Sequence, residues 1–241
     1  MKNIMQRHRI SRLLIATAVG GWIAMSAAAA FAQQTPQTAD MSVTGTIVPA
    51  ACSANFEGGG VVDFGTIRLI DLPANAYYAV GSRDVALNVN CTANKTVTFT
   101  VQDLQIASKI ADTAMYAATG TSGRAAPQYV YGLGEASVSG ASVKLGSYSI
   151  AYRTSPPTTV DGISKTVLTR VGTAAWTPLV SHYTSSGEIF SAGTSAAAGA
   201  TAGRAFYFPM RITAALNYGS RLQVAQDTPF NGQAVFAINY Q

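Results

Sequence analysis

Alternation of apolar and polar residues at every second position constrains the fold of this chain most strongly. The apolar positions of residues 85–91 alternate with small or polar ones, and residues 96–101 alternate even more regularly. A period of two places alternate side chains on one face of a β-strand, so both segments are predicted to be half-buried strands. Further strands are predicted at residues 43–47, 61–67, 129–133, 143–152, 165–170, 205–212, 222–225 and 234–240.

Turn-forming residues separate these segments. Gly58-Gly59-Gly60, Asp161-Gly162 and Asn231-Gly232 are typical of tight turns. No long amphipathic helix is evident, and residues 106–118 could form at most a short one. Many short strands with turns between them favour an all-β, antiparallel sandwich.

Some stretches fit this pattern poorly. Residues 104–128 and the small-residue tract at 191–204 are predicted to be loop insertions, and residues 154–164 a further loop. An organisation in two domains, divided near residue 125, is the less favoured alternative because no charged or proline-rich linker marks a boundary.

The first 32 residues have the pattern of a secretory signal peptide. Basic residues at positions 2, 7, 9 and 12 precede an apolar run that closes on Ala30-Phe31-Ala32. Small residues at −3 and −1 predict cleavage after Ala32. The alternative is an uncleaved membrane anchor, because the 20 residues from Leu13 to Ala32 are long enough to span a bilayer.

The basic character of the chain belongs mainly to this leader. Removing its four basic residues from the 16 Lys and Arg leaves 12 against 11 Asp and Glu. A nearly balanced mature chain gives no reason to expect nucleic acid or an anionic membrane as a partner.

The two cysteines, Cys52 and Cys91, predict a disulfide, because an exported protein meets an oxidising compartment. The alternative is a pair of buried free thiols. Together with His182, the single histidine outside the leader, they do not have the usual spacing of a zinc site.

Catalytic patterns are missing from the sequence. A nucleophile–histidine site would have to use His182, which lies beside a predicted strand. Gly132-Leu133-Gly134 lacks the third glycine of a dinucleotide loop, and Gly58-Gly59-Gly60 lacks the Lys-Ser/Thr of a phosphate loop. We therefore predict that the chain is not an enzyme and needs no cofactor or metal.

Four stretches have the order and character of strands in a known family. They are residues 43–52 with an Ala-Ala-Cys ending, residues 62–67, residues 87–91 with the second cysteine, and residues 234–241 with a penultimate Tyr240. Together they resemble the type 1 pilin-like subunits of chaperone–usher fimbriae, in particular the larger, poorly characterised fimbrial-like proteins. The resemblance covers both ends of the mature chain and hardly touches residues 104–204.

The resemblance implies an incomplete immunoglobulin-like sandwich, the pilin fold, which is completed in trans by a donor strand. A periplasmic chaperone would fill the open edge, and another pilus subunit would replace it with its own N-terminal extension at the outer-membrane usher. Residues 43–241 would form the pilin-like domain and residues 33–42 the extension. The chain would pass through the periplasm to a fimbrium at the cell surface.

The terminal strand carries the binding role in this scheme. Phe236, Ile238 and Tyr240 are expected to share one face, and the resemblance implies that basic residues of the chaperone hold the carboxylate of Gln241. The alternative is an ordinary closing strand of a complete sandwich.

The candidate donor strand is weakly apolar. Ala39 and Met41, continuing to Val43, provide its alternating series, and Pro36 cannot donate to a ladder. Such a donor suits a tip subunit or one added in low numbers; alternatively, the donor register begins further along the chain.

Three functions are compatible with these patterns. The leading one is a structural pilus subunit that contributes to surface adhesion, and the third is a secreted enzyme of unrelated function. The second is a tip adhesin that binds a glycan receptor through aromatic residues. The aromatic candidates are Tyr116, Tyr129, Tyr131, Tyr148, Tyr152, Trp176 and Tyr183.

Overall fold

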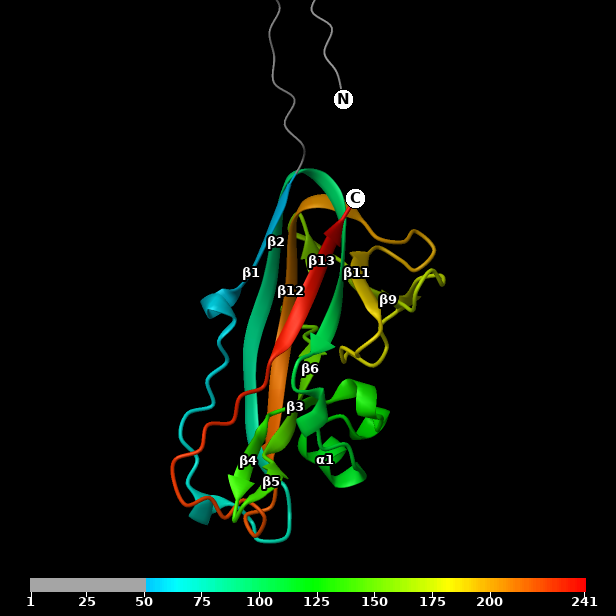
Figure 1. The fold of residues 1–241 in the computed structure, drawn as a ribbon. Helices are drawn as coiled ribbons and strands as arrows, with labels where there is room; N and C mark the ends of the chain where they lie inside the picture. Colours follow the sequence, from blue (N-terminus) through cyan, green and yellow to red (C-terminus); the bar gives the residue numbers. More distant parts are fainter. Residues whose placement is uncertain (1–50) are drawn as a thin grey trace, which may run out of the picture. The chain divides into compact units, whose positions relative to one another are not determined.

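The computed structural model describes residues 51–241, whose regular structure is almost entirely β (Figure 1). Its strands are β1 (Cys52–Phe56), β2 (Tyr78–Asp103), β3 (Tyr131–Gly132), β4 (Glu135–Val138), β5 (Ala141–Lys144), β6 (Gly146–Tyr152), β7 (Thr159–Val160), β8 (Ile163–Ser164), β9 (Thr166–Arg170), β10 (Thr177–Pro178), β11 (Ile189–Gly193), β12 (Ala202–Leu216) and β13 (Ala234–Tyr240). Short helical turns at Glu57–Gly60, Leu69–Asp71, Ile106–Ser108, Ser122–Arg124 and Pro127–Tyr129 accompany the helix α1 (Thr113–Ala118). No helix in this part of the chain is long and apolar enough to span a membrane.

The 26-residue strand β2 belongs to both layers of a sandwich. Its first part pairs with β1 and β12, and β12 continues the layer to β6 and β3. Its last part, from Val97 to Asp103, pairs with β13, while Phe99 and Thr100 also pair with β11, which leads to β9 and β10. In Figure 1, β2 rises along one layer, bends over and descends in the other. All these pairings are antiparallel, so the predicted all-β, immunoglobulin-like sandwich is confirmed.

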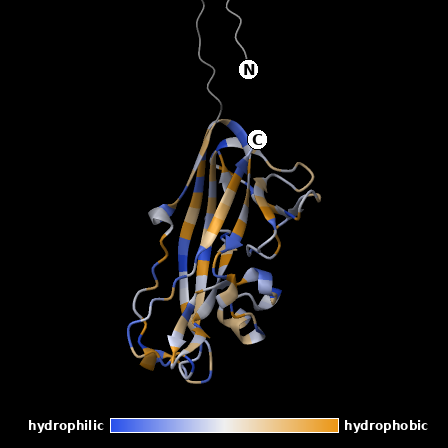
Figure 2. Cartoon of the chain, viewed as in Figure 1, coloured by the Kyte–Doolittle hydropathy of each residue, from blue (hydrophilic) through white to orange (hydrophobic). Residues whose placement is uncertain are grey.

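The core lies between the two layers. Phe99 of β2 contacts Phe190 of β11 and Phe208 of β12, with ring centroids 5.8 and 5.0 Å apart, and all three rings are fully buried. Each buried ring of this kind stabilises the fold by about 1.5–3 kcal/mol. Figure 2 shows the predicted alternation of hydrophobic and hydrophilic residues along the strands that enclose this core.

Several predicted strands match the structure. β13 occupies the predicted residues 234–240, and residues 85–91 and 96–101 are both strand, although they form one continuous strand. Residues 143–152 divide into β5 and β6. Asp161 and Gly162 form the predicted turn, both with positive φ, between β7 and β8.

Other predictions were wrong. Residues 191–193 are not loop but the buried last residues of β11, where a Cβ on Gly193 would lie 2.2 Å from the backbone oxygen of Gly199. The small residues that had predicted a loop here allow close packing. Residues 222–225 form no strand, and in the segment 129–133 only Tyr131–Gly132 pairs. The strand predicted at residues 43–47 and the signal peptide lie outside the described residues.

The insertion at residues 104–128 is structured rather than an open loop. Its helix α1 begins after Asp112, whose Oδ1 accepts a hydrogen bond from the Met115 backbone N–H at 2.9 Å. Met115 is fully buried, so the insertion packs against the sandwich.

An ion pair across β2 and β12 supports a prediction about stability. Arg211 donates two hydrogen bonds to Asp84, at 2.7 and 3.1 Å, and Arg153 lies 3.1 Å from the same carboxylate. The hydrogen bonds from Arg211 hold the pKa of Asp84 below its ordinary value. Asp84→Asn should lower the free energy of unfolding by roughly 1 kcal/mol at pH 7, because the pair is partly exposed.

The pH dependence of this effect has a definite sign. A lowered carboxyl pKa stabilises the folded state above about pH 4, the ordinary value for Asp, and this contribution is lost as the pH falls through the lowered value. Urea unfolding of both proteins at pH 7 and pH 2.5 should therefore show a larger difference at pH 7 than at pH 2.5. An equal difference at both pH values would contradict this role of the charge.

Candidate binding groove at one edge of the sandwich

The edge strands on the two sides of the sandwich differ in length and in how well they are protected. On one side the outermost strands are β3 and β10, of two residues each, and β10 contains Pro178. Short edge strands and proline discourage pairing with another chain. On the other side, within residues 51–241, β1 and the seven-residue β13 each pair with β2 alone. One edge of β13 is therefore available for a further strand.

Two hollows lie along this side. The first, of about 540 Å³, lies beside the beginning of β13 and is floored by Tyr148, Ile150 and Met210. The second, of about 780 Å³, reaches Leu145, Leu216 and Leu222 beyond the start of that strand. Both are lined by Val62, Phe64 and Phe230, so they form one groove, which we call the edge groove.

Residues 61–67 form one wall of the edge groove. They were predicted to be a strand, and this is wrong, since they pair with no other strand in the described residues. Their side chains nevertheless keep the alternation of a strand: Val62 and Phe64 are half-buried and pack against the core, whereas their neighbours are exposed. Residues 61–67 form no hydrogen-bonded ladder within the described chain, because the edge groove occupies the place where a partner strand would lie.

Local contacts hold this wall in place. Gly58, Gly59 and Gly60 all have positive φ and form the predicted turn after β1. The guanidinium of Arg83 lies 5.3 Å from the ring centroid of Phe64, and its Nε donates to the carbonyl of Asp63 at 3.2 Å. The wall is thereby attached to β2.

The opposite wall consists of residues 224–233 and β13; Figure 1 shows both walls on the same side of the sandwich. Phe236 and Ile238 are half-buried against the core, and Val235, Ala237 and Asn239 are exposed, which is the expected alternation. Tyr240 is 41% exposed, so it contributes less to this face than expected.

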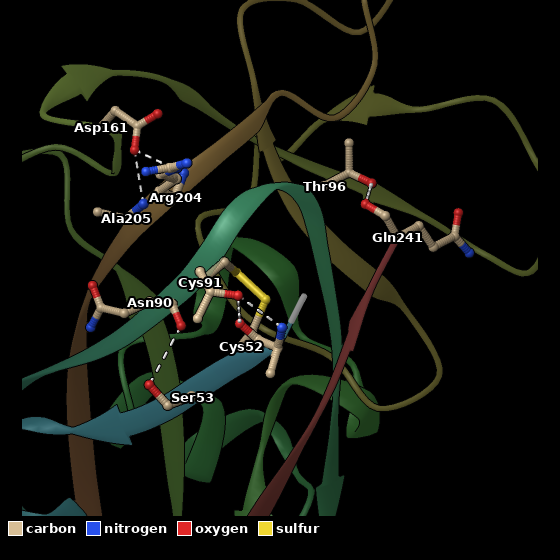
Figure 3. The surroundings of a disulfide bond; sticks show 11 residues. Cys52, Ser53, Asn90, Cys91, Thr96, Asp161, Arg204, Ala205 and Gln241 are labelled. Carbon is tan, nitrogen blue, oxygen red and sulfur yellow. Dashed lines mark hydrogen bonds between the residues drawn. A yellow bond between two sulfur atoms is a disulfide. The ribbon is translucent and has the colours of Figure 1, made fainter. Parts of the chain in front are cut away.

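The ladder of β13 extends to the last residue. The backbone N–H of Gln241 donates to the carbonyl of Thr96 at 3.1 Å, and the carbonyl of Gln241 accepts from the backbone N–H of Thr96 at 3.0 Å. The hydroxyl of Thr96 also donates to the carbonyl of Gln241 (Figure 3). These bonds attach Gln241 to β2.

The predicted disulfide is confirmed. Cys52 of β1 and Cys91 of β2 lie directly opposite each other in the ladder and are bonded (Figure 3). The backbone N–H of Thr92 donates to the carbonyl of Ala51 at 2.9 Å beside the bond. The disulfide therefore clamps β1, an edge strand of five residues, to the strand that both layers share.

Phe56 connects the two walls. Its ring packs edge-on against Phe236, with centroids 4.9 Å apart, and Phe236 also lies 5.8 Å from Phe99 of the core. β1 and β13 belong to different layers, so this contact crosses the open side of the sandwich.

Phe56 and Phe230 line the groove, although no sequence pattern predicted a role for them. Phe56 and Phe64 lie 174 and 166 positions before Phe230, and only the fold brings the two walls together. Gly232 was predicted to be part of a turn, but here a Cβ would lie 2.5 Å from Cε1 of Tyr148. Its missing side chain lets the wall approach the ring.

The other predicted positions lie away from this groove or in the core. Five of the seven aromatic candidates for glycan binding are buried: Tyr116, Tyr129, Tyr131, Tyr148 and Tyr152. Burial raises the pKa of Tyr148 and Tyr152, as expected for core side chains. Trp176 is half-buried, with the Arg170 guanidinium 4.4 Å from its ring centroid. The candidate donor residues Ala39, Met41 and Val43 lie outside the described residues.

Neither catalytic nor metal chemistry is evident in the described part of the chain. His182 is exposed, with a φ of +60°, and its carbonyl accepts a hydrogen bond from the Tyr152 backbone N–H. No three His, Cys, Asp or Glu side chains within residues 51–241 lie close enough to hold a metal ion.

Part of the chain matches a known protein family. Residues 41–149 match the model of a family described as a protein of unknown function (DUF1120). The match includes both cysteines, β1, β2 and the groove wall at residues 61–67, and it stops before β12 and β13. No curated protein matches the chain.

Proposed function

We propose that this protein is a structural subunit of a chaperone–usher pilus, assembled by donor-strand exchange and contributing to surface adhesion. The observation that carries the proposal is that, within residues 51–241, one edge of β13 has no partner strand and lies beside an apolar groove. An exposed, regular edge strand is an aggregation hazard that proteins normally block. The edge strands on the opposite side, β3 and β10, are protected because they are short, whereas the longer edge of β13 has no such protection.

The groove has the chemistry of a site for an extended strand. Backbone pairing along β13 supplies affinity, and alternate apolar side chains of the incoming strand enter the hollows. Leu145, Met210 and Leu216 provide apolar contact there. Residues 61–67 already have an extended, alternating pattern on the other side, so an incoming strand would lie between β13 and the half-buried side chains of Val62 and Phe64.

The sequence before β1 offers a donor of the same type. Ala39, Met41 and Val43 lie at alternate positions, and the series continues through Gly45 to Ile47. The first paired residue of β1 is Cys52, so this segment is not needed for the described ladder with β2. We propose that a donor register extending to Ile47 compensates for the polar residues before Ala39.

Periplasmic expression tests this function. When it is co-expressed with a periplasmic chaperone of a chaperone–usher system, the mature chain should be recovered as a stoichiometric complex, and without the chaperone it should aggregate or be degraded. The reason is that the edge groove exposes strand edge and apolar surface when empty. A stable, monomeric chain that needs no chaperone would overturn the proposal.

A matched pair of variants tests whether the chaperone binds at β13. Ile238→Asp places a charge on the half-buried face of β13, whereas Asn239→Asp places it on the neighbouring, exposed face. Chaperone capture, measured by co-purification, should be lost in the first variant and retained in the second. Equal capture of both would show that the chaperone binds elsewhere.

A further inference from the structure

One arginine that stacks on an aromatic ring differs from the others in its surroundings. Within residues 51–241, three guanidinium groups lie over aromatic rings: those of Arg83, Arg170 and Arg221. Arg83 donates hydrogen bonds to two carbonyls, and Arg221 is exposed. Arg170 is half-buried, lies 4.4 Å from the ring centroid of Trp176 and belongs to none of the ion pairs in the described residues.

The charge of Arg170 is therefore held by a ring and not by a carboxylate. Its Nε atom is buried and has no hydrogen-bond partner within residues 51–241. A guanidinium that is partly removed from water usually pairs with an acceptor, because donors that lose water without gaining a partner are costly. Arg170 thus presents a planar set of donors for which the described chain supplies no carboxylate.

The small-residue tract between β11 and β12 holds the indole of Trp176 in place. A Cβ on Gly199 would lie 3.5 Å from Cδ1 of that ring. The tract also approaches β11 and β9 closely: a Cβ on Gly193 would lie 2.2 Å from the backbone oxygen of Gly199 and 2.6 Å from Cδ1 of Leu168. Larger side chains would push the tract away from the ring. A ring that is already held loses little freedom when it contacts a ligand.

The pair of Arg170 and Trp176 lies away from the edge groove. Arg170 ends β9, and Trp176 directly precedes β10, the outermost strand of its layer. In Figure 1, β9 and β1 lie on opposite sides of the sandwich. A strand or a chaperone bound at β13 would occupy the groove side, so the pair stays available in an assembled subunit.

The two side chains combine the chemistry for one class of ligand. A planar guanidinium donates two parallel hydrogen bonds to a carboxylate, which is a strong and directional contact. The negatively polarised face of an indole attracts the polarised C–H groups of a sugar ring, and Trp176 is only half-buried. A sugar that carries a carboxylate has both features, whereas a neutral sugar lacks the charged acceptor.

We propose that Arg170 and Trp176 form a binding site for an acidic sugar, in which Arg170 donates to the carboxylate and Trp176 contacts the ring. This inference goes beyond the proposed function, because a structural subunit needs no such site. It would let the assembled protein bind an acidic polysaccharide. The chain after the predicted leader has 12 basic and 11 acidic residues, so binding would depend on this local site and not on a general attraction for anions.

Titration with tetragalacturonate, a chain in which each sugar carries a carboxylate, tests the site. The mature chain is used in the form recovered from the periplasm, alone or with the chaperone, and binding is measured by isothermal titration calorimetry. The wild type should bind tetragalacturonate but not maltotetraose, an uncharged chain of equal length. Arg170→Gln should bind roughly tenfold more weakly, because it loses charge-assisted hydrogen bonds.

Two further arginine variants provide the controls. Arg221→Gln removes a guanidinium that lies 5.1 Å from the ring centroid of Tyr218, and it should bind as the wild type does. Arg170→Lys keeps the charge and the apolar stem but loses the planar fork, so its affinity should be intermediate. Arg170→Lys also decides the matter if circular dichroism shows that Arg170→Gln is unfolded.

Tryptophan fluorescence reports on the ring itself. Removal of the predicted leader removes Trp22, which leaves Trp176 as the single tryptophan of the chain. Tetragalacturonate should therefore change the tryptophan emission of the wild type and leave that of Trp176→Phe unchanged.

Three results would overturn the site: no binding by the wild type, equal binding of the charged and uncharged chains, or equal loss of binding in Arg170→Gln and Arg221→Gln. None of these results bears on strand capture, which is judged by whether the chain needs the chaperone.

Discussion

Removing the disulfide by the double substitution Cys52→Ser and Cys91→Ser should lower the free energy of unfolding by roughly 4 kcal/mol. The bond joins residues 39 positions apart, and a cross-link over a loop of this length restricts the unfolded chain by about that amount. For a domain of this size the melting temperature should fall by roughly 8–16 °C. Thermal unfolding followed by circular dichroism measures the shift.

The reductant provides the control for this experiment. Treating the wild type with dithiothreitol should reproduce the lower melting temperature, whereas the double variant should not respond. An unchanged melting temperature in the variant would show that the β1–β2 ladder alone holds β1. Substituting both cysteines together avoids a free thiol, which could form bonds between molecules.

Truncation after Asn239 is expected to abolish chaperone capture. The truncation removes Tyr240, which pairs with Val97, and Gln241, whose backbone makes two hydrogen bonds to Thr96. The new carboxylate would lie about 7 Å back along the strand, at 3.3 Å per residue. A chaperone that holds the carboxylate and pairs with β13 could not make both contacts in the same register.

Co-purification with a tagged chaperone measures this effect. Tyr240→Phe is the matched control, because it keeps the ladder and the position of the carboxylate, and it should be captured normally. Unchanged capture of the truncated chain would refute the role proposed for Tyr240 and Gln241.

The local pattern predicted the strands that lie between the apolar core and solvent. The bounds of β13 follow from alternation alone, because Phe236 and Ile238 face the core and their neighbours face solvent. The pairing of Cys52 with Cys91 followed from there being only two cysteines. Alternation did not distinguish a paired strand from the extended wall at residues 61–67, since both bury every second side chain.

Burial of the aromatic residues could not be predicted in the same way. Tyr131 and Tyr148 stack on each other with centroids 5.3 Å apart inside the sandwich, although a tyrosine in a strand suits a core or a binding surface equally. The last residues of β11 resembled a loop because small residues serve close packing as well as loops.

The sequence by itself determined the all-β class, the disulfide and the strand that ends the chain, because each depends on local periodicity or on residue type. Only the tertiary structure decided that β2 bends through both layers, that residues 61–67 lack a ladder and that Phe56 meets Phe236. Those features depend on which distant segments come together; Phe56 and Phe236 lie 180 positions apart in the chain and 4.9 Å apart between ring centroids. The edge groove is made of such long-range contacts, and a one-dimensional pattern does not contain them.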